Sequence, residues 1–302
     1  MAEEKSIAQI NDRIRNGEAR VLTDQELIKE IQEGDRFNWS EVDVIIISCQ
    51  STASGTAAML CVPVAERGVF TRAEKIWLND IPGFPGPAPN ERLGLVDTLI
   101  FSDQLANNGR EDYNGAELLY DLIKRERIHA KCLSVEGEIY ESAFILDELE
   151  FARMYVYNFF LHKLCSENQS SSKANFLQTI RVGSKILLNK ATGIVIGCGT
   201  RSAPESRSLS LAADMFEMDP EYIKQSEAKQ ERNMINSVVL AIPILNNDIW
   251  NDLKDYLLKQ RPREFEDTNQ DIINAITKYL KKKLQSGESL LICSDMHIKN
   301  WY

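Results

Sequence analysis

The chain has 302 residues, of which 43% are hydrophobic and 26% charged, the proportions of an ordinary soluble globular protein. Its 45 acidic and 35 basic residues give a formal net charge of −10, which repels nucleic acid and anionic membranes, so neither is an expected partner. No stretch of about 20 apolar residues predicts a transmembrane helix, and the N-terminus lacks the features of a signal peptide, so we expect a cytoplasmic protein.

Two short amphipathic helices are predicted at the start of the chain. Residues 6–17 hold three isoleucines at helical spacing, and Gly17 can end that helix. Thr23 opens the sequence T-D-Q-E, a capping box with Glu26 at the third helical position. The second helix is expected to end near Gly34.

A buried strand and a ligand-binding loop are predicted next. Residues 42–47 (VDVIII) form a continuous apolar run, which is typical of a strand covered on both faces. Small residues follow directly in 48–58 (SCQSTASGTAA), and ligand loops of this kind lie at the carboxyl ends of sheet strands. We expect Ser54 and Gly55 to bind substrate and Cys49 to be a catalytic thiol. The alternative for Cys49 is a small buried hydrophobe.

Residues 79–95 contain four of the nine prolines and three glycines, a composition that argues against helix or regular strand. Long irregular loops inside compact domains are commonly functional. Asn90, Glu91 and Arg92 follow the prolines, and together their amide, carboxylate and guanidinium suit an amino-acid substrate. The alternative is a structural salt bridge that holds the loop in place.

Strands and helices are predicted to alternate through the rest of the chain. The middle contains a strand at 96–101, a helix at 115–126, a hairpin of strands 128–135 and 138–145, and a helix at 146–164. Polar residues 166–175 predict a flexible loop or a boundary between subdomains. Then follow a second hairpin (180–188 and 193–197), a strand at 236–245, helices at about 248–259 and 268–284, and a short final strand at 290–293.

These elements predict an α/β fold of mixed α and β, with a central mixed sheet and flanking helices. One large domain is expected, made of a core (1–247) and a C-terminal helical segment with a short final strand (248–302). A smaller subdomain after the polar stretch is the alternative.

The six cysteines are scattered, without a C-x-x-C pair, which argues against disulfides and against a local zinc or iron–sulfur site. We therefore expect no cofactor in this chain and expect most of the thiols to be buried. The cysteines are Cys49, Cys61, Cys132, Cys165, Cys198 and Cys293.

Several stretches resemble a known family. They are residues 53–94, which include PGFPGPAPNERLG, and residues 113–128, 145–155 and 193–223. Their order and spacing resemble methanogenesis marker protein 16, a branch of the archaeal homocysteine-biosynthesis family. The resemblance covers close to half of the chain.

The resemblance implies a protein of sulfur metabolism in a methanogen. Relatives in this family resemble L-aspartate semialdehyde sulfurtransferases, which make homocysteine from the aldehyde, sulfide and reducing equivalents. A cysteine persulfide is implied as the sulfur carrier, with electrons supplied by a ferredoxin-like iron–sulfur domain or partner.

The chain departs from the family pattern in three places. The family has a cysteine just after the hairpin strand, and here Ser134, rather than Cys132, is nearest to that position. A glycine- and cysteine-rich middle segment is replaced by the polar residues 166–175, and no ferredoxin-type cysteine run follows the core. Any iron–sulfur cluster is therefore expected on a partner protein.

Two further segments are candidates for the site. Cys132 is the second catalytic candidate because it lies close to the family's cysteine, although strand alternation places His129 and Lys131 on the opposite face. Gly197 and Gly199 allow close backbone approach to a ligand, and Thr200 and Arg201 complete a stretch that matches the family. A simple turn with a surface arginine is the alternative.

Two charged clusters have plainer interpretations. Asp214, Glu217 and Asp219 could hold a divalent cation, but capping of the helix that opens at Pro220 is favoured. The lysines at 281–283 are interpreted as a solvated helix end.

Three functions stay open. The first is an enzyme that transfers sulfur to a small amino-acid-like aldehyde. The second is a non-catalytic, methanogenesis-associated subunit or assembly factor that binds an iron–sulfur partner. The third is a metal-binding regulator, which no ligand cluster supports. A homo-oligomer is compatible with each of them.

Overall fold

The computed structural model describes most of the chain, and all structural statements refer to these parts. Predictions for Cys165, Thr200, Arg201, Cys293 and the segments 166–175 and 290–293 lie outside them. The described residues are 4–34, 38–86, 89–107, 113–160, 179–199, 208–225, 234–259 and 270–287.

The strands join into one 14-stranded mixed sheet, which confirms the predicted fold class. β1 and β2 pair in parallel, and the other pairs are antiparallel. The order is β1-β2-β14-β10-β11-β12-β9-β3-β6-β5-β4-β7-β8, with β13 paired to β14. The bounds are β1 Val21–Thr23, β2 Val44–Ser51, β3 Ala53–Pro63, β4 Ala73–Leu78, β5 Ile81–Pro85, β6 Leu95–Phe101, β7 Ile128–Ser134, β8 Ile139–Phe144, β9 Ala152–Phe160, β10 Lys185–Leu188, β11 Ala191–Cys198, β12 Ser208–Asp214, β13 Ile223–Gln225 and β14 Met234–Pro243.

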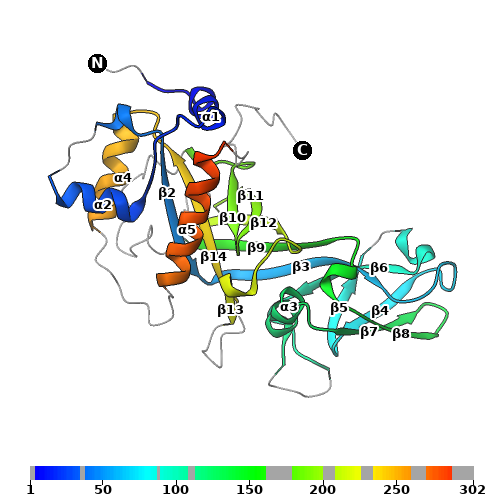
Figure 1. Ribbon diagram of the computed structural model, residues 1–302. Helices are drawn as coiled ribbons and strands as arrows, with labels where there is room; N and C mark the ends of the chain where they lie inside the picture. Colours follow the sequence, from blue (N-terminus) through cyan, green and yellow to red (C-terminus); the bar gives the residue numbers. More distant parts are fainter. Residues whose placement is uncertain are drawn as a thin grey trace.

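The molecule is elongated, and most of its helices gather at one end (Figure 1). α1, α2, α4 and α5 surround β2 and β14, whereas α3 packs beside the half formed by β4 to β8. None of the helices in the described parts is long and apolar enough to cross a membrane. The helices are α1 Ile7–Arg15, α2 Asp24–Gln32, α3 Gly115–Ile123, α4 Asn247–Lys259 and α5 Gln270–Gln285, with 3-10 turns η1 Trp39–Glu41, η2 Pro89–Leu93, η3 Leu146–Glu148 and η5 Pro220–Tyr222.

Strand β2 is covered on both faces, as its apolar run predicts. Val44 and Ile46 belong to a core cluster that also contains buried residues of α1 and α5. Ile45 and Ile47 face the larger cluster, which includes Leu27 of α2 and Trp250 of α4. Burial of such a side chain is worth about 1.5–3 kcal/mol, so helices on both sides stabilise this end of the sheet.

The predicted local signals for helices and hairpins are confirmed. The Thr23 hydroxyl accepts a hydrogen bond from the Glu26 N–H, and the Glu26 carboxylate accepts one from the Thr23 N–H, which completes the capping box. β7 and β8 form the first predicted hairpin, and β10 and β11 form the second. Asn189 and Lys190 turn the second hairpin with positive φ values of 50° and 77°, as a type I′ turn requires.

Several predictions about secondary structure are wrong. In the described part of the helix predicted at 146–164, residues 146–160 form a 3-10 turn followed by strand β9, whose pairing with β12 and β3 outweighs its helical pattern. The loop predicted at 48–58 is strand up to Ser51 and again from Ala53. Strand β10 begins at Lys185 rather than at residue 180.

The proline-rich segment 79–95 is more regular than its composition predicts. It contains β5, which pairs with both β4 and β6, and the 3-10 turn η2. Gly83 permits this packing, because a Cβ atom there would lie 2.5 Å from a methyl carbon of Thr98. The prediction of an irregular segment is therefore wrong for β5 and η2.

Candidate functional site

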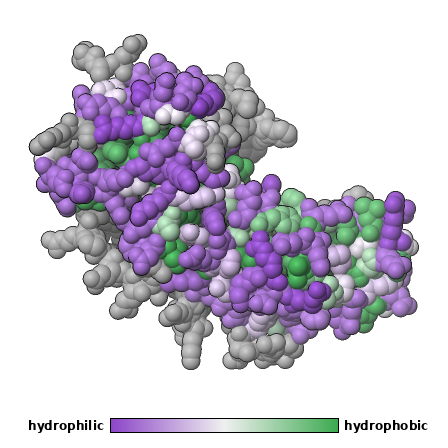
Figure 2. Space-filling view, in the orientation of Figure 1, coloured by the Kyte–Doolittle hydropathy of each residue, from purple (hydrophilic) through white to green (hydrophobic). Residues whose placement is uncertain are grey.

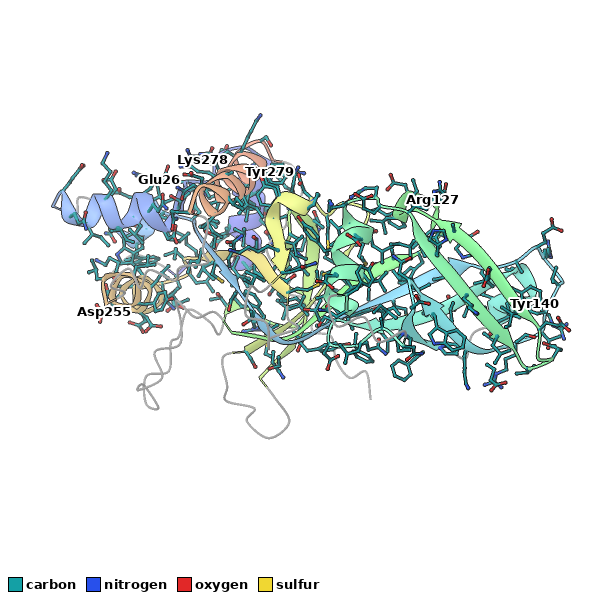
Figure 3. All side chains as sticks on the ribbon, turned by 90° about the horizontal axis from the view of Figure 1, so that it is seen from below. Glu26, Arg127, Tyr140, Asp255, Lys278 and Tyr279 are labelled. Carbon is teal, nitrogen blue, oxygen red and sulfur yellow. The ribbon has the colours of Figure 1, made fainter. Side chains whose placement is uncertain are left out.

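The two predicted catalytic thiols lie in different halves of the molecule. Cys49 is on β2, where it pairs with Val238 and belongs to the buried core. Cys132 is on β7, between Ile76 of β4 and Tyr140 of β8, and is fully buried. Figure 1 places β2 among the helices and β7 at the opposite end, and Figure 3 shows Tyr140 near that far tip. The two cysteines therefore do not share one cleft, and their catalytic roles stay predictions.

Burial determines the acidity of Cys132. It raises the pKa of this thiol to about 11, and the negative charge of Glu91 contributes to the rise. At neutral pH the thiol is protonated, so it needs a conformational opening or a base before it can act as a nucleophile. Ser134 lies two residues further along β7, is also buried, and accepts a hydrogen bond from the Glu138 N–H.

The tripeptide Asn90–Glu91–Arg92 forms most of η2, and its side chains have different environments. The Asn90 amide donates a hydrogen bond to Asp97 over 2.9 Å, so it is used within the fold. Glu91 is buried, whereas Arg92 is exposed. Substrate binding by these three residues stays a prediction, and so does the alternative of a structural salt bridge that holds the loop in place.

Cys61 lies next to Asn90 and Asp97, although the sequence analysis identifies it only as one of several scattered thiols. It pairs with Asp97 across β3 and β6, and its thiol forms a hydrogen bond with that carboxylate. Burial, Asp97 and Glu150 raise its pKa to about 12. Cys61, Asp97 and Asn90 thus form a satisfied polar cluster under η2.

The predicted substrate residues Ser54 and Gly55 lie near the start of β3. Gly55 pairs with Tyr157 of β9, and the side chain of Ser54 is exposed. They belong to a regular strand rather than to a loop, so their N–H groups are not gathered into a ligand-binding nest. Their role in binding stays a prediction.

The glycine-flanked turn lies at the end of β11. Gly199 has a φ of +73°, and its N–H donates to the Ser208 carbonyl over 2.8 Å. Cys198 between the glycines is exposed, whereas Cys49, Cys61 and Cys132 are buried. The Cys198 thiol donates a weak hydrogen bond to the Ile180 carbonyl over 3.9 Å. Partial desolvation raises the pKa of this thiol. It is the accessible thiol among the four that the structure describes.

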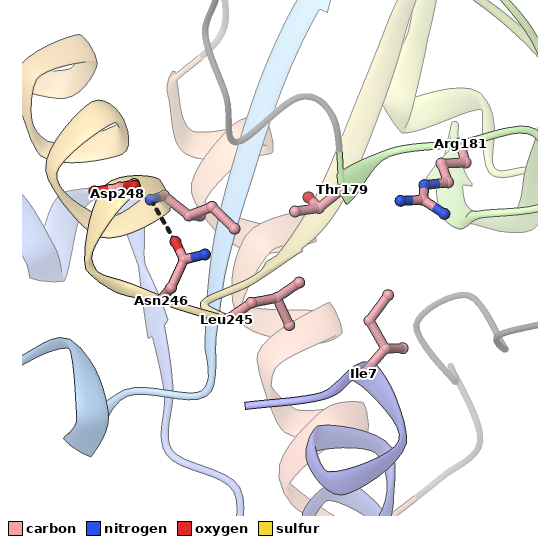
Figure 4. Close-up of a pocket in the computed structure, with 7 residues that line it drawn as sticks. Ile7, Thr179, Arg181, Leu245, Asn246 and Asp248 are labelled. Carbon is pink, nitrogen blue, oxygen red and sulfur yellow. Dashed lines mark hydrogen bonds between the residues drawn. The ribbon is translucent and has the colours of Figure 1, made fainter. Parts of the chain in front are cut away.

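A pocket of about 390 Å³ lies between the segment before β10 and the start of α4 (Figure 4). Thr179 and Arg181 line it, and these two residues flank Ile180, the contact of Cys198. Asn246 and Asp248 line another side, at the beginning of α4. Its apolar lining comes from Ile7, Leu245 and Ile249.

The start of α4 is held by a side-chain cap. The Asn246 side-chain oxygen accepts a hydrogen bond from the Ile249 N–H over 3.0 Å, the dashed line in Figure 4. Asp248 follows in the first turn, where the helix dipole favours a negative charge. Asn246–Asn247–Asp248 is a recognisable helix-start signal, so sequence analysis could have found this side of the pocket. Arg181 carries no such local signal.

The acidic cluster and the lysine run have structural roles. Asp219 caps η5 by accepting from the Glu221 N–H, and it binds Lys190 over 2.7 Å, which confirms capping. Lys281 binds Glu26 of α2, so the prediction of a solvated helix end is wrong for that residue. Within the described ranges, no three acidic, histidine or cysteine residues gather as a metal site.

Hydrophobic residues interrupt the surface at the end opposite the helices (Figure 2). Val69, Val135 and Ile139 are among the exposed large hydrophobic side chains there. They come from the β3–β4 connection and the β7–β8 hairpin, away from the pocket.

Sequence comparison identifies a family. A family model described as "Homocysteine biosynthesis enzyme, sulfur-incorporation" matches residues 19–175 and 171–259. This range includes Cys198, Arg181 and the start of α4, so most of the pocket lies within it. The marker protein 16 branch is not identified by this match and stays a prediction.

Relatives from methanogens match most of the chain. An uncharacterized protein of Methanothermobacter thermautotrophicus is 30% identical over 283 residues, which cover 83% of this chain and 65% of the relative. The L-aspartate semialdehyde sulfurtransferase of Methanosarcina acetivorans is 23% identical, and the match covers 86% of this chain and 60% of the relative. The enzyme of that name from Methanocaldococcus jannaschii is 24% identical, and the match covers 81% of this chain and 55% of the relative. The chain thus spans less than two thirds of the length of these relatives. No solved structure matches it.

Proposed function

Because this chain belongs to the homocysteine-biosynthesis family that incorporates sulfur, we propose that it transfers sulfide-derived sulfur to L-aspartate semialdehyde. The supporting observation is the match to two relatives named L-aspartate semialdehyde sulfurtransferase, each of which aligns with more than 80% of the chain. The product of this reaction is homocysteine, in which a thiol replaces the aldehyde oxygen.

The chemistry needs a sulfur donor and a reductant. In the overall reaction an aldehyde and hydrogen sulfide, with two electrons and two protons, give the thiol and water. The persulfide route needs sulfane sulfur: a persulfide donor transfers its outer sulfur to the cysteine thiolate and leaves as a thiol. Delivery of that sulfur to the aldehyde then takes four electrons and four protons and regenerates the cysteine thiol. The carbon–oxygen bond breaks, a carbon–sulfur bond forms, and the sulfur–sulfur bond is cleaved.

A carrier thiol has to reach both the sulfur donor and the aldehyde. Cys198 fits this requirement because it is exposed and lies between two glycines. Its raised pKa means that a nearby cation or base has to favour the thiolate. Cys49 and Cys132 are the alternative carriers, and both require the core to open.

The electrons come from outside this chain in our proposal. The described residues contain no cysteine cluster that could hold an iron–sulfur centre. We propose a ferredoxin-like iron–sulfur protein as the donor.

The test is a reconstituted reaction with defined thiol variants. Protein that has been loaded with sulfane sulfur by a persulfide donor and then desalted is incubated without oxygen with L-aspartate semialdehyde and titanium(III) citrate, and homocysteine is measured by mass spectrometry. Cys198→Ser should abolish product formation, whereas Cys61→Ser, a buried control thiol, should retain it. Loss of product only in Cys49→Ser or Cys132→Ser would assign the carrier to that residue. No product in any reaction, even with a ferredoxin added, would refute the proposed activity.

The second candidate is a non-catalytic subunit or assembly factor that binds an iron–sulfur protein. The observation that favours it is the burial of three of the four described thiols, with raised pKa values for Cys61 and Cys132. A variant with serine at all six cysteines separates the two candidates. If it restores growth of a deletion strain fully, the chain does not act as a sulfur carrier.

A further inference from the structure

The middle strands of the sheet have one buried face and one open face. In β9, Ala152, Met154 and Val156 are buried, whereas Arg153 and Tyr157, which point to the other face, are exposed. Strand β9 lies between β12 and β3 in the middle of the molecule (Figure 1). Residues opposite each other in paired strands share a face, so the open face continues from β9 onto β11, β12, β3 and β6.

The open face is apolar, although a solvated sheet face ordinarily carries polar side chains. One row of residues crosses the five strands at a single level and alternates between large and small side chains. From β11 to β6 the row is Ile194, Ala212, Tyr155, Ala57 and Phe101. Ile194 is 42% exposed and Tyr157, the next outward residue of β9, is 39% exposed, so the chain leaves this face open to solvent.

Two opposite charges lie on the same face, one level away from this row. Arg153 of β9 lies opposite Asp214 of β12. The Arg153 guanidinium lies over the Phe151 ring, 5.4 Å from its centroid, and Asp214 accepts a hydrogen bond from the Phe216 N–H over 3.0 Å. The charges of Arg153 and Asp214 cancel, whereas the chain as a whole carries a net charge of −10.

We propose that this face binds a second copy of the chain about a two-fold axis. The axis runs parallel to β9 and β12 and passes between them, so β9 of each protomer lies over β12 of its partner. Because a two-fold contact is isologous, every contact then occurs twice. Tyr155 packs on the partner's Ala212, and Arg153 forms an ion pair with the partner's Asp214.

Shape and charge both favour a second copy as the occupant. In this arrangement Ile194 lies over the partner's Ala57 and Tyr155 over the partner's Ala212, so large side chains meet small ones, as interdigitated layers require. The exchange of Arg153 and Asp214 matches charges of opposite sign at both places. Two sheets that pack face to face in this way form the core of a β-sandwich. The acidic chain thus meets its copy through a face whose charges are balanced.

Sedimentation velocity of the full chain over a concentration series measures the association, and we expect a reversible dimer. Arg153→Asp and Asp214→Arg should each weaken dimerisation at least about tenfold, since like charges then meet at two places. Arg67→Asp reverses an exposed arginine of the β3–β4 connection, at the end opposite the helices, and should dimerise like the parent protein. Circular dichroism melting shows whether each variant is folded.

A further variant leaves the Asp214 hydrogen bond intact. Tyr157→Asp changes an exposed side chain of the open face and should also weaken dimerisation at least about tenfold, because it places an unpaired charge in the interface. Its control is Ile139→Asp, which changes an exposed apolar side chain at the end opposite the helices and should leave dimerisation unchanged.

An equimolar mixture of Arg153→Asp and Asp214→Arg tests the two-fold contact itself. In the mixed dimer the two introduced charges attract each other, and so do the native Asp214 of one chain and the native Arg153 of the other. The mixture should therefore dimerise although each variant alone does so poorly, a rescue that an effect within one chain cannot produce.

Four results would overturn the proposal. They are a parent protein that stays monomeric from nanomolar to high micromolar concentration, unchanged dimerisation by folded Arg153→Asp and Tyr157→Asp, no rescue in the mixture, and loss of the dimer in Ile139→Asp alone. Association is measured without substrate or reductant, so its outcome is independent of the sulfur-transfer assay.

Discussion

Lys281 of α5 donates hydrogen bonds to both carboxylate oxygens of Glu26 in α2, each over 2.6 Å. The contact joins a helix near the start of the chain to a helix near its end. Glu26 also accepts from the Thr23 N–H, so one carboxylate completes a capping box and binds a distant helix. Glu26 and Lys278 of α5 lie near each other at the helical end of the molecule in Figure 3.

This contact predicts a loss of stability in acid. Burial alone would raise the pKa of Glu26, but hydrogen bonds from Lys281 and Thr23 outweigh it and lower the pKa below the ordinary value of 4.5. The stabilisation is therefore present above the unfolded-state pKa and is lost as pH falls through the lower, folded-state pKa. Urea unfolding at pH 7 and pH 3 should show a smaller pH effect in Glu26→Gln than in the parent protein.

The magnitude is modest because the Glu26 side chain is 45% exposed. We expect Glu26→Gln to cost up to about 1 kcal/mol at pH 7. Glu33→Gln, whose ion pair with Lys29 is more exposed, is the control and should have almost no effect. Identical pH profiles for the parent and Glu26→Gln would contradict the prediction.

A buried amide network should make Asn189 sensitive to substitution. Its side chain donates to the Asn236 side-chain oxygen over 2.8 Å and accepts from the Ser237 N–H over 2.9 Å, and all three residues are buried. Asn189→Ala leaves the Asn236 side-chain oxygen and the Ser237 N–H without these partners, and alanine must still adopt a positive φ of 50°. We therefore expect the free energy of unfolding to fall by about 2–4 kcal/mol. Chemical denaturation measures the cost.

Asn189→Gly separates the two causes. Glycine tolerates the positive φ but also loses the hydrogen bonds. The free energy of unfolding should therefore fall less in Asn189→Gly than in Asn189→Ala, and the difference should equal the backbone strain of alanine. If both variants unfold at the same denaturant concentration as the parent protein, the network does not contribute to stability.

Two glycines with the same backbone angle should respond differently to alanine. Gly94 and Gly68 both have φ +83°, but a Cβ at Gly94 would lie 2.0 Å from the Ala65 carbonyl oxygen, whereas Gly68 has open space. Gly68→Ala should cost about 1 kcal/mol from strain, and Gly94→Ala should cost about 2–3 kcal/mol more from the clash. Thermal melting of both variants compares them, and similar melting temperatures would show that the β3–β4 connection adapts.

The thiols should differ in reactivity. In native protein at pH 8, iodoacetamide should modify Cys198 faster than Cys49, Cys61 or Cys132, because the other three are buried. The pKa values of about 12 for Cys61 and about 11 for Cys132 slow these thiols further. Peptide mapping by mass spectrometry assigns the modified residues. In urea the four rates should converge, and fast native labelling of Cys49 or Cys132 would instead indicate an opening of the core.

Much of the local structure could be predicted because it depends on residues close together in the chain. The capping box at Thr23 and Glu26 is formed over three residues, and the β7–β8 hairpin needs one short turn. Strand β9 could not be predicted, because its conformation depends on pairing with β3 and β12, which are distant in sequence. The same holds for Cys49, which lies in a regular strand because β14 pairs along the whole length of β2.

The sequence by itself determined the family, the α/β fold class and the short-range helix and hairpin signals, since each of these depends on the order and spacing of nearby residues. Only the tertiary structure decided that Cys132 is buried and Cys198 accessible, because burial depends on which distant elements cover a strand. It likewise brought Arg181 and Asp248 to one pocket: a cavity forms where several segments fail to fill the space between them, and local sequence cannot specify that space.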